Sequence, residues 1–273
     1  MLDKLRTIRS FILDMDGVLY RGRLPLPGAP QFIEYLQSQR TPFILLTNNS
    51  TQTAAQYVTK LREMGIAVAE ESILTSAQAT ALYLRQIAAP GTRVYVIGEK
   101  GLRQAIEENG YLDSDEGAAF VVVGWDRQLT YDKLKRATLA IRNGAQFIGT
   151  NPDRTFPSEE GIVPGNGAIL AAIQAATDVE PTIIGKPEPT VFRLALERMA
   201  AAAKETAVVG DRLETDILGG HRAGLTTILL LSGVCNKEEL AGSNLKPDLV
   251  FEGVQELHTA LREARVSGVA QSE

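Results

Sequence analysis

The 273-residue sequence is poor in the residues that crosslink a chain or bind soft metals. It has one cysteine, Cys235, and therefore cannot form a disulfide within the chain. That cysteine and the two histidines, His221 and His258, are too few for a zinc cluster. The uncharged stretch 161–177 is too short to span a bilayer and is interrupted by Pro164–Gly167. These absences exclude a disulfide-stabilised scaffold, a zinc protein and a membrane-spanning helix.

The chain also lacks a strong excess of either charge. It carries 28 Lys and Arg against 33 Asp and Glu, a net charge of −5. This mild acidity argues against nucleic acid and anionic membranes as partners, because both require a basic face. Residues 1–10 contain several charges and no apolar core of the kind a signal peptide needs, so we expect a cytoplasmic protein.

What the sequence does have is a regular alternation of short apolar runs and amphipathic stretches. The apolar runs are rich in β-branched and aromatic residues and predict buried strands at 11–13, 43–46, 94–97, 120–123, 147–148, 207–209, 227–231 and 249–251. The amphipathic stretches predict helices that include 52–64, 131–143, 190–203 and 215–223. Strands that alternate with helices in this way indicate an α/β fold with parallel sheets covered by helices.

Two breaks in this pattern bear on the domain organisation. One lies at residues 88–92 and the other at 178–181, and the segment between them has strands and helices of its own. The periodicity alone is equally consistent with one continuous doubly wound domain and with a small α/β domain inserted into a larger one.

Carboxylates follow two of the predicted strands. Asp14 and Asp16 come after the first strand, and Asp211 and Asp216 follow the strand at 207–209. Ligands of open parallel sheets bind beyond the carboxyl ends of the strands. Carboxylates gathered there need a cation, and Mg²⁺ takes one or two carboxylates together with substrate phosphate and water. Asp14 and Asp211 would supply that minimum set.

A carboxylate beside Mg²⁺ suits phosphoryl transfer. Asp14 would attack phosphorus, and Asp16 would act as general acid and then as general base. The Thr47 hydroxyl, the backbone amides near Asn48 and the Lys186 ammonium would hold the phosphoryl group. Each of these residues taken alone is more often a turn, a helix cap or a solvated charge, so the hypothesis depends on the whole set.

This set resembles the haloacid dehalogenase superfamily of phosphohydrolases, and its extended matches are similar to the NagD-type branch. The motifs that carry the resemblance are Asp14-x-Asp16-Gly17-Val18-Leu19-Tyr20-Arg21-Gly22, Thr47-Asn48-Asn49-Ser50, Lys186-Pro187 and Gly210-Asp211-x-x-x-Thr215-Asp216-Ile217. The resemblance implies a Rossmann-like parallel-sheet core, residues 1–80 and 182–273, with an inserted α/β cap domain, residues 81–181.

The resemblance also implies roles for individual residues. Mg²⁺ would be held by the Asp14 side chain, the Asp16 backbone carbonyl and Asp211, with Asp216 supporting these ligands. Asp14 would be the nucleophile, Asp16 the acid and base, and Thr47 and Lys186 the phosphoryl-binding side chains.

The expected function is Mg²⁺-dependent hydrolysis of a small phosphate monoester, such as a sugar phosphate, a nucleotide, phosphoglycolate or p-nitrophenyl phosphate. Asn151, Asp153 and Arg154 follow a predicted strand of the cap and are candidates for selecting the substrate, although such a segment is equally typical of a turn. A phosphomutase or phosphotransferase with the same nucleophile is an alternative, and a phospho-aspartate signalling module is a more distant one. The sequence leaves a homo-oligomer open.

Overall fold

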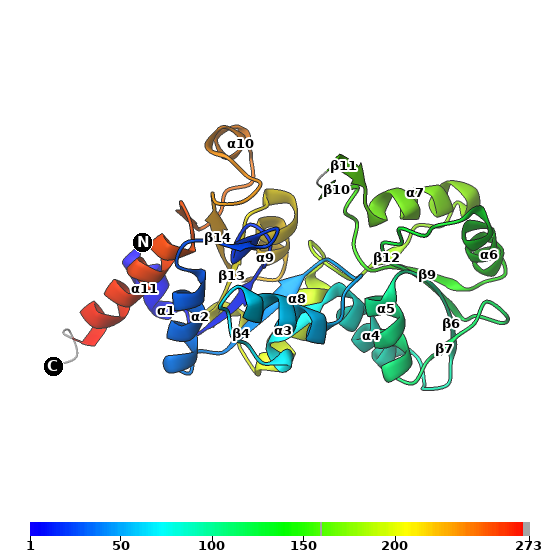
Figure 1. The fold of residues 1–273 in the computed structure, drawn as a ribbon, viewed down its shortest axis with the longest axis horizontal. Helices are drawn as coiled ribbons and strands as arrows, with labels where there is room; N and C mark the ends of the chain where they lie inside the picture. Colours follow the sequence, from blue (N-terminus) through cyan, green and yellow to red (C-terminus); the bar gives the residue numbers. More distant parts are fainter. Residues whose placement is uncertain (159, 270–273) are drawn as a thin grey trace. The chain divides into compact units, whose positions relative to one another are not determined.

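The computed structural model describes residues 1–158 and 160–269, which form parts of two compact units (Figure 1). The first unit comprises Met1–Leu46, Tyr57–Ile73 and the chain from Phe192 onward. The second comprises Thr47–Gln56 and Leu74–Val191. The division into domains 1–80 with 182–273 and 81–181 stays a prediction.

A six-stranded sheet forms the centre of the first unit, in the order β15-β14-β13-β1-β4-β5. The β15/β14, β14/β13, β13/β1 and β1/β4 pairs are all parallel. Its strands are β1 (Ser10–Leu13), β4 (Phe43–Thr47), β5 (Ile73–Thr75), β13 (Thr206–Gly210), β14 (Thr226–Leu230) and β15 (Leu249–Phe251). β1 and β13 are buried along their whole length, which explains why their sequences are apolar without alternation.

Helices and short elements surround this sheet. The helices are α1 (Leu2–Thr7), α2 (Ala29–Ser38), α3 (Ala54–Glu63), α8 (Pro189–Met199), α9 (Leu218–Arg222), α10 (Lys237–Gly242) and α11 (Val254–Val269). A π-helical turn covers Leu213–Ile217, 3₁₀ turns cover Glu70–Ser72 and Ala203–Glu205, and a small hairpin joins β2 (Tyr20–Arg21) to β3 (Leu24–Pro25).

The second unit has its own sheet, in the order β12-β9-β8-β6-β7, with parallel pairing throughout. Its strands are β6 (Arg93–Ile97), β7 (Leu112–Asp113), β8 (Phe120–Val123), β9 (Gln146–Gly149) and β12 (Thr182–Ile183). An antiparallel hairpin pairs β10 (Thr155–Ser158) with β11 (Gly161–Pro164).

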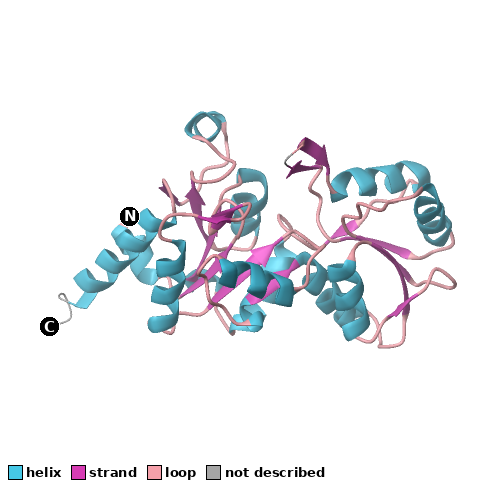
Figure 2. Cartoon of the chain, viewed as in Figure 1, coloured by secondary structure: helices cyan, strands magenta, loops and turns pink. Residues whose placement is uncertain are grey.

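Helices cover both faces of this second sheet (Figure 2). α4 (Ser76–Ile87) and α5 (Lys100–Glu108) pack together on one face, and α6 (Tyr131–Arg142) and α7 (Asn166–Thr177) on the other (Figure 1). The chain leaves β6 toward β7 and leaves β8 toward β9, so the winding changes direction between β6 and β8. Open sheets of this kind bind ligands at the carboxyl ends of their strands.

The predicted α/β class with parallel sheets is confirmed. One predicted helix, 215–223, differs in detail: the chain first forms the π-helical turn Leu213–Ile217 and only then α9. The turn places Asp216 in a buried position. β5 and β7 lie outside the predicted strands, because each is only two or three residues long and carries little periodicity.

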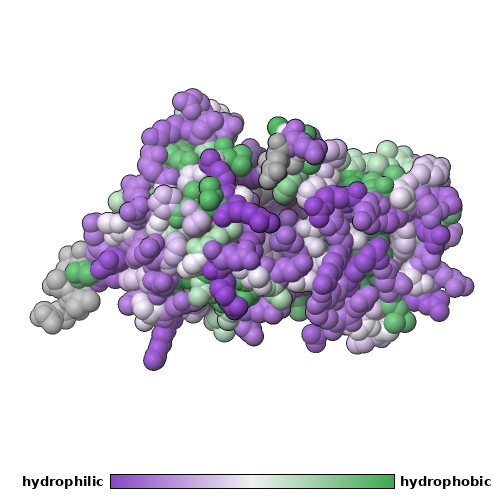
Figure 3. Space-filling model, viewed as in Figure 1, coloured by the Kyte–Doolittle hydropathy of each residue, from purple (hydrophilic) through white to green (hydrophobic). Residues whose placement is uncertain are grey.

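Hydrophilic side chains cover most of the face shown in Figure 3, and apolar ones are scattered among them. Within the described residues, no helix has the length and apolar character needed to cross a bilayer.

A buried hydroxyl pair joins the first strand to its neighbour and provides a test of the core. Ser10 Oγ lies 2.7 Å from Thr206 Oγ1, which itself donates to the Ala202 carbonyl. Thr206→Val keeps the shape but leaves the buried Ser10 hydroxyl without this acceptor, so we expect a loss of about 1–3 kcal/mol in unfolding free energy. Urea denaturation measures it. The same change at the exposed Thr259 is the control and should stay within about 0.5 kcal/mol of wild type.

Candidate active site

Three carboxylates meet at the carboxyl end of the larger sheet. Asp14 follows β1, Asp211 follows β13, and Asp216 belongs to the π-helical turn. One oxygen of each lies within 4.8 Å of the others. β1 and β13 are adjacent and parallel with Leu13 opposite Val209, so the residues that follow them emerge side by side. The predicted convergence of Asp14 with Asp211 is therefore present in the structure.

Asp211 is held in place by the loop that follows β14. Its Oδ2 accepts a hydrogen bond of 2.7 Å from the Val234 amide, and its carbonyl accepts one of 3.0 Å from the Cys235 amide. Two glycines make room for this carboxylate: a Cβ at Gly17 would lie 2.2 Å from Oδ2, and one at Gly233 would lie 1.9 Å from it. No side chain fits at either position without displacing the acid.

Asp216 is enclosed in the same way. Its Oδ2 accepts from the Arg212 amide and the Thr215 hydroxyl, both at 3.3 Å. A Cβ at Gly210 would lie 2.1 Å from the Asp216 Cβ, so β13 can end here only with glycine. π-helical turns are rare and occur mostly at functional sites. The turn places the buried Asp216 carboxylate close to Asp14 and Asp211.

This donor set fits a hard divalent cation. Carboxylate oxygens are the ligands that Mg²⁺ prefers, and one or two of them with water and phosphate complete its shell. Asp211 and Asp216 are 2% and 1% exposed, so their charges are poorly screened by water and a cation would offset their repulsion.

Asp16 lies in a tight turn two residues beyond Asp14. The turn is closed by a bridge between Asp16 and Tyr20 and by a hydrogen bond of 2.8 Å from the Gly17 amide to the Tyr20 carbonyl. The Lys60 ammonium lies 3.9 Å from the centre of the Tyr20 ring, a cation–π contact. A basic side chain of α3 is therefore fixed beside the turn that carries Asp16.

The charge balance around Asp16 suits an acid that exchanges protons. Desolvation by the surrounding protein raises the pKa of Asp16, and the positive charges of Lys60, Arg212 and Arg21 oppose the rise. Burial lowers the pKa of Lys60, while the nearby Asp16 raises it. A carboxyl with a raised pKa keeps its proton to higher pH and can donate it to a leaving group.

The predicted phosphate-binding residues Asn48 and Lys186 are in direct contact. The Lys186 amide donates to Asn48 Oδ1 at 2.8 Å, and Asn48 Nδ2 donates to the Lys186 carbonyl at 2.9 Å. Thr47 ends β4, next to β1 in the sheet, and its hydroxyl accepts from the Asn49 amide at 3.2 Å. The Lys186–Pro187 peptide is cis.

The segment predicted to select the substrate lies against Asn48. Asn48 Nδ2 donates to both carboxylate oxygens of Asp153 at 3.2 and 3.3 Å. Asn151 is buried, and its amide donates to the Asn48 carbonyl at 2.8 Å. Its side chain is thus engaged with the backbone, which favours a structural role for Asn151. Arg154 is exposed, and substrate selection by Asp153 and Arg154 stays a prediction.

Comparison with known proteins decides the family. Residues 11–112 match the family model described as haloacid dehalogenase-like hydrolase, and residues 183–257 match the HAD-hydrolase-like model. The chain belongs to the haloacid dehalogenase-like hydrolases. It is 43% identical to an acid sugar phosphatase of Staphylococcus aureus over 253 residues, which cover 92% of this chain and 97% of that protein.

Solved structures agree and identify the branch. A 4-nitrophenylphosphatase from Thermotoga maritima is 40% identical with a TM-score of 0.91, covering 94% of this chain and 99% of that one. NagD from Escherichia coli K-12 is 36% identical with a TM-score of 0.86, covering 91% and 98%. The predicted resemblance to the NagD-type branch is confirmed, and the chain is a phosphatase of this hydrolase family.

Sequence reasoning missed several residues of this hydrolase that shape the site. Gly233 and Val234 hold Asp211, and Lys60 lies beside the Asp16 turn. None belongs to a predicted motif, and each reaches the acids through a contact distant in the chain. A lysine within the predicted helix 52–64 and a glycine two residues after the predicted strand 227–231 are the signals that could have pointed to them.

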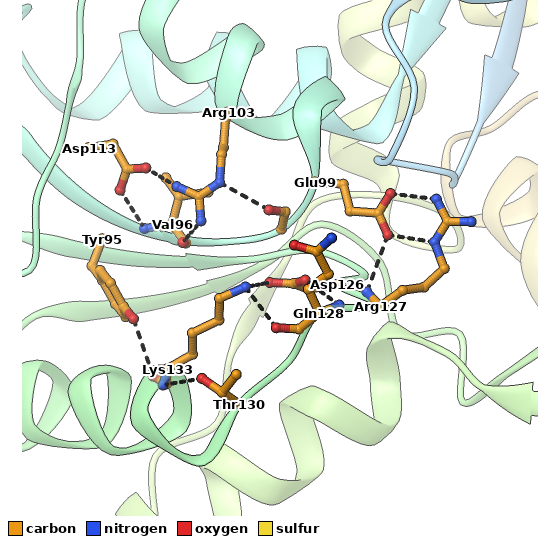
Figure 4. A network of polar contacts seen from close by, with 11 residues as sticks. Tyr95, Val96, Glu99, Arg103, Asp113, Asp126, Arg127, Gln128, Thr130 and Lys133 are labelled. Atoms are coloured by element: carbon orange, nitrogen blue, oxygen red, sulfur yellow. Dashed lines mark hydrogen bonds and ion pairs between the residues drawn. The ribbon is translucent and has the colours of Figure 1, made fainter.

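A separate polar network lies in the second unit of the hydrolase (Figure 4). Glu99 accepts from Arg127 at 2.6 and 2.7 Å, and the buried Asp126 accepts from Lys133 at 2.7 Å. These residues line a pocket of about 790 Å³ at the carboxyl ends of β6 and β8. Glu99 follows β6 and Arg127 follows β8, so their ion pair spans the point where the direction of winding changes. The network therefore joins the two halves of this sheet.

The Glu99–Arg127 pair predicts a pH dependence. Hydrogen bonds and charge from Arg127 lower the pKa of Glu99 below its ordinary value. The ionised Glu99 therefore stabilises the fold fully above the pKa it has in the unfolded chain, and this stabilisation is lost as the pH falls through the lower pKa of the folded protein. Arg127→Gln should reduce the unfolding free energy by about 0.5–1 kcal/mol at pH 7, because the pair is partly exposed. Denaturation curves at pH 7 and 3 measure the difference, which should shrink at pH 3. An equal difference at both values would contradict this assignment.

Proposed function

We propose that this hydrolase cleaves small phosphate monoesters with Mg²⁺ through an aspartyl phosphate formed on Asp14. The convergence of Asp14, Asp211 and Asp216 within 4.8 Å carries the proposal, because it supplies a nucleophile together with a cation site. The names of the relatives support sugar phosphates and p-nitrophenyl phosphate as the substrate types.

The chemistry follows from the acids in two displacements. An oxygen of Asp14 attacks phosphorus, the bond from phosphorus to the ester oxygen breaks, and Asp16 gives that oxygen its proton. Asp16 then takes a proton from water, whose oxygen attacks the phosphoryl group and releases phosphate. Asp14 is regenerated as a carboxylate and Asp16 as an acid, so the cycle balances.

Asp14, Asp211 and the Asp16 backbone carbonyl are the proposed ligands of Mg²⁺, and Asp216 supports them. When bound, the ion neutralises charge on the transferred phosphoryl group. Thr47, the backbone amides near Asn48 and the Lys186 ammonium bind the phosphoryl oxygens. Arg154 and Asp153 are proposed to contact the rest of the ester, and the cytoplasm stays the expected location.

Asp14→Asn tests the nucleophile. An amide does not attack phosphorus at a useful rate, so turnover of p-nitrophenyl phosphate should fall at least about 10³-fold. Release of p-nitrophenol at saturating Mg²⁺ measures it, with thermal melting as the check on folding. Asp178→Asn, at the αL end of α7, is the matched control and should keep full activity. A folded Asp14→Asn enzyme with undiminished turnover would remove Asp14 from this role.

Asp211→Asn tests the cation site. Losing one charged ligand should raise the Mg²⁺ concentration for half-maximal activity about 10- to 100-fold. Mg²⁺ should also raise the melting temperature of wild type, since it binds only the folded state, and do so less in the variant at equal concentration. If both proteins respond to Mg²⁺ alike by melting and by activity, Asp211 is no ligand.

Removing the metal with EDTA should abolish wild-type turnover, and Mg²⁺ should restore it.

A further inference from the structure

The Asn48 side chain pairs with the main chain of one residue, Lys186. It accepts from the Lys186 amide at 2.8 Å and donates to the Lys186 carbonyl at 2.9 Å. Lys186 is 3% exposed, so its main-chain groups cannot rely on water for hydrogen bonds. The asparagine therefore supplies both a donor and an acceptor that the buried peptide needs.

Asn48 is itself fixed by further hydrogen bonds. Its carbonyl accepts from the Ser76 hydroxyl at 2.6 Å and from the Asn151 amide at 2.8 Å. Its remaining Nδ2 proton is directed to the Asp153 carboxylate. Because both Nδ2 protons of Asn48 are engaged, its side-chain amide is held in one orientation. The Lys186 main chain that pairs with this amide is held in place with it.

The residue before the lysine is adapted to this close approach. The Gly185 amide donates to the Thr150 carbonyl at 2.9 Å. A Cβ at Gly185 would lie 2.7 Å from Asn48 Oδ1 and 2.5 Å from the Thr150 oxygen. Any larger residue would push the strand end away from Asn48 and move the lysine that follows.

We propose that Asn48 is a positioning residue, whose side-chain amide sets where the Lys186 ammonium meets the phosphoryl group and joins that lysine to the loop at Asp153. This inference rests on the proposed function, since it assigns Asn48 an effect that acts through Lys186. It differs from the sequence-based expectation, in which only the backbone near Asn48 contributed. The Asn48 side chain makes both hydrogen bonds to the Lys186 main chain, so a substitution at residue 48 should change how the enzyme binds phosphate.

Asn48→Asp is the informative change. The carboxylate can still accept from the Lys186 amide, but it cannot donate to the Lys186 carbonyl, and it repels Asp153. We expect kcat/KM for p-nitrophenyl phosphate to fall about 10- to 100-fold and the inhibition constant of inorganic phosphate to rise over the same range. Asn109→Asp, the same change at the C-cap of α5, should leave both unchanged.

A double-mutant cycle separates positioning from general support of the fold. Lys186→Met removes the ammonium, so a residue that acts through it has nothing further to lose. Asn48→Asp combined with Lys186→Met should match Lys186→Met alone within about 2-fold. Losses that multiply would overturn the proposal, and so would an Asn48→Asp enzyme with wild-type kinetics.

Two further measurements keep the outcomes distinct. If Asn48→Asp melts early, Asn48→Asp combined with Asp153→Asn removes the like-charge repulsion and should recover folding and part of the activity. The cycle is then measured in that background against Asp153→Asn.

A wild-type enzyme that neither hydrolyses the ester nor binds phosphate refutes the proposed function and this inference with it. An active wild type whose Lys186→Met variant is weakened but still measurable, with losses at Asn48 that multiply with those at Lys186, refutes the inference alone.

Discussion

The repulsion among Asp14, Asp211 and Asp216 is the constraint on which the larger unit depends. Two unit charges 4.8 Å apart repel by about 3–4 kcal/mol at an effective dielectric constant of 20. A fold that serves only stability has no reason to bring three carboxylates so close, since marginal stability leaves little room for such a cost. The parallel β1/β13 pairing nevertheless forces the first two together, and the π-helical turn adds the third. Binding of a divalent cation, as proposed, would turn this local instability into affinity and would link the folding of this region to its function.

Glycine makes this arrangement sterically possible. Gly17, Gly210 and Gly233 each lie so close to Asp211 or Asp216 that an added methyl group would overlap the acid. Gly17 also has a φ of 83°, which side-chain-bearing residues rarely adopt. The carboxylates are thus surrounded by backbone, and backbone amides such as that of Val234 hold them. A main chain packed this tightly restricts where the acids can move, so it holds them close to the geometry of the site.

The predictable features of this chain are those that depend on local pattern and on strand order. Runs such as 120–123 are buried strands, and the acids after 11–13 and 207–209 meet because parallel neighbours end together. What pattern could not show depends on distant contacts. The helix expected at 215–223 begins as a π-turn, in which the Ile217 amide donates to the Arg212 carbonyl and the Arg212 amide donates to the Asp216 carboxylate. Lys60 reaches Tyr20 across the fold, and Asn48 reaches Lys186 across 138 positions. No periodicity within either segment encodes such a partner.

The two units hold the side chains of the proposed site by different kinds of interaction. The first uses charges, whose repulsion a cation relieves. Around Lys186 the second uses asparagines: Asn166 donates to the Asn151 carbonyl, Asn151 to the Asn48 carbonyl, and Asn48 to the Lys186 carbonyl. A neutral amide both donates and accepts, so it can join buried loops without adding charge. A carboxylate at residue 48 would draw the lysine ammonium away from a phosphate dianion, and a second cation would compete for it. An amide adds no charge beside Lys186, so under the proposed function it would leave the lysine charge to the phosphate ligand, which is a physical reason for asparagine where the lysine's main chain must be fixed.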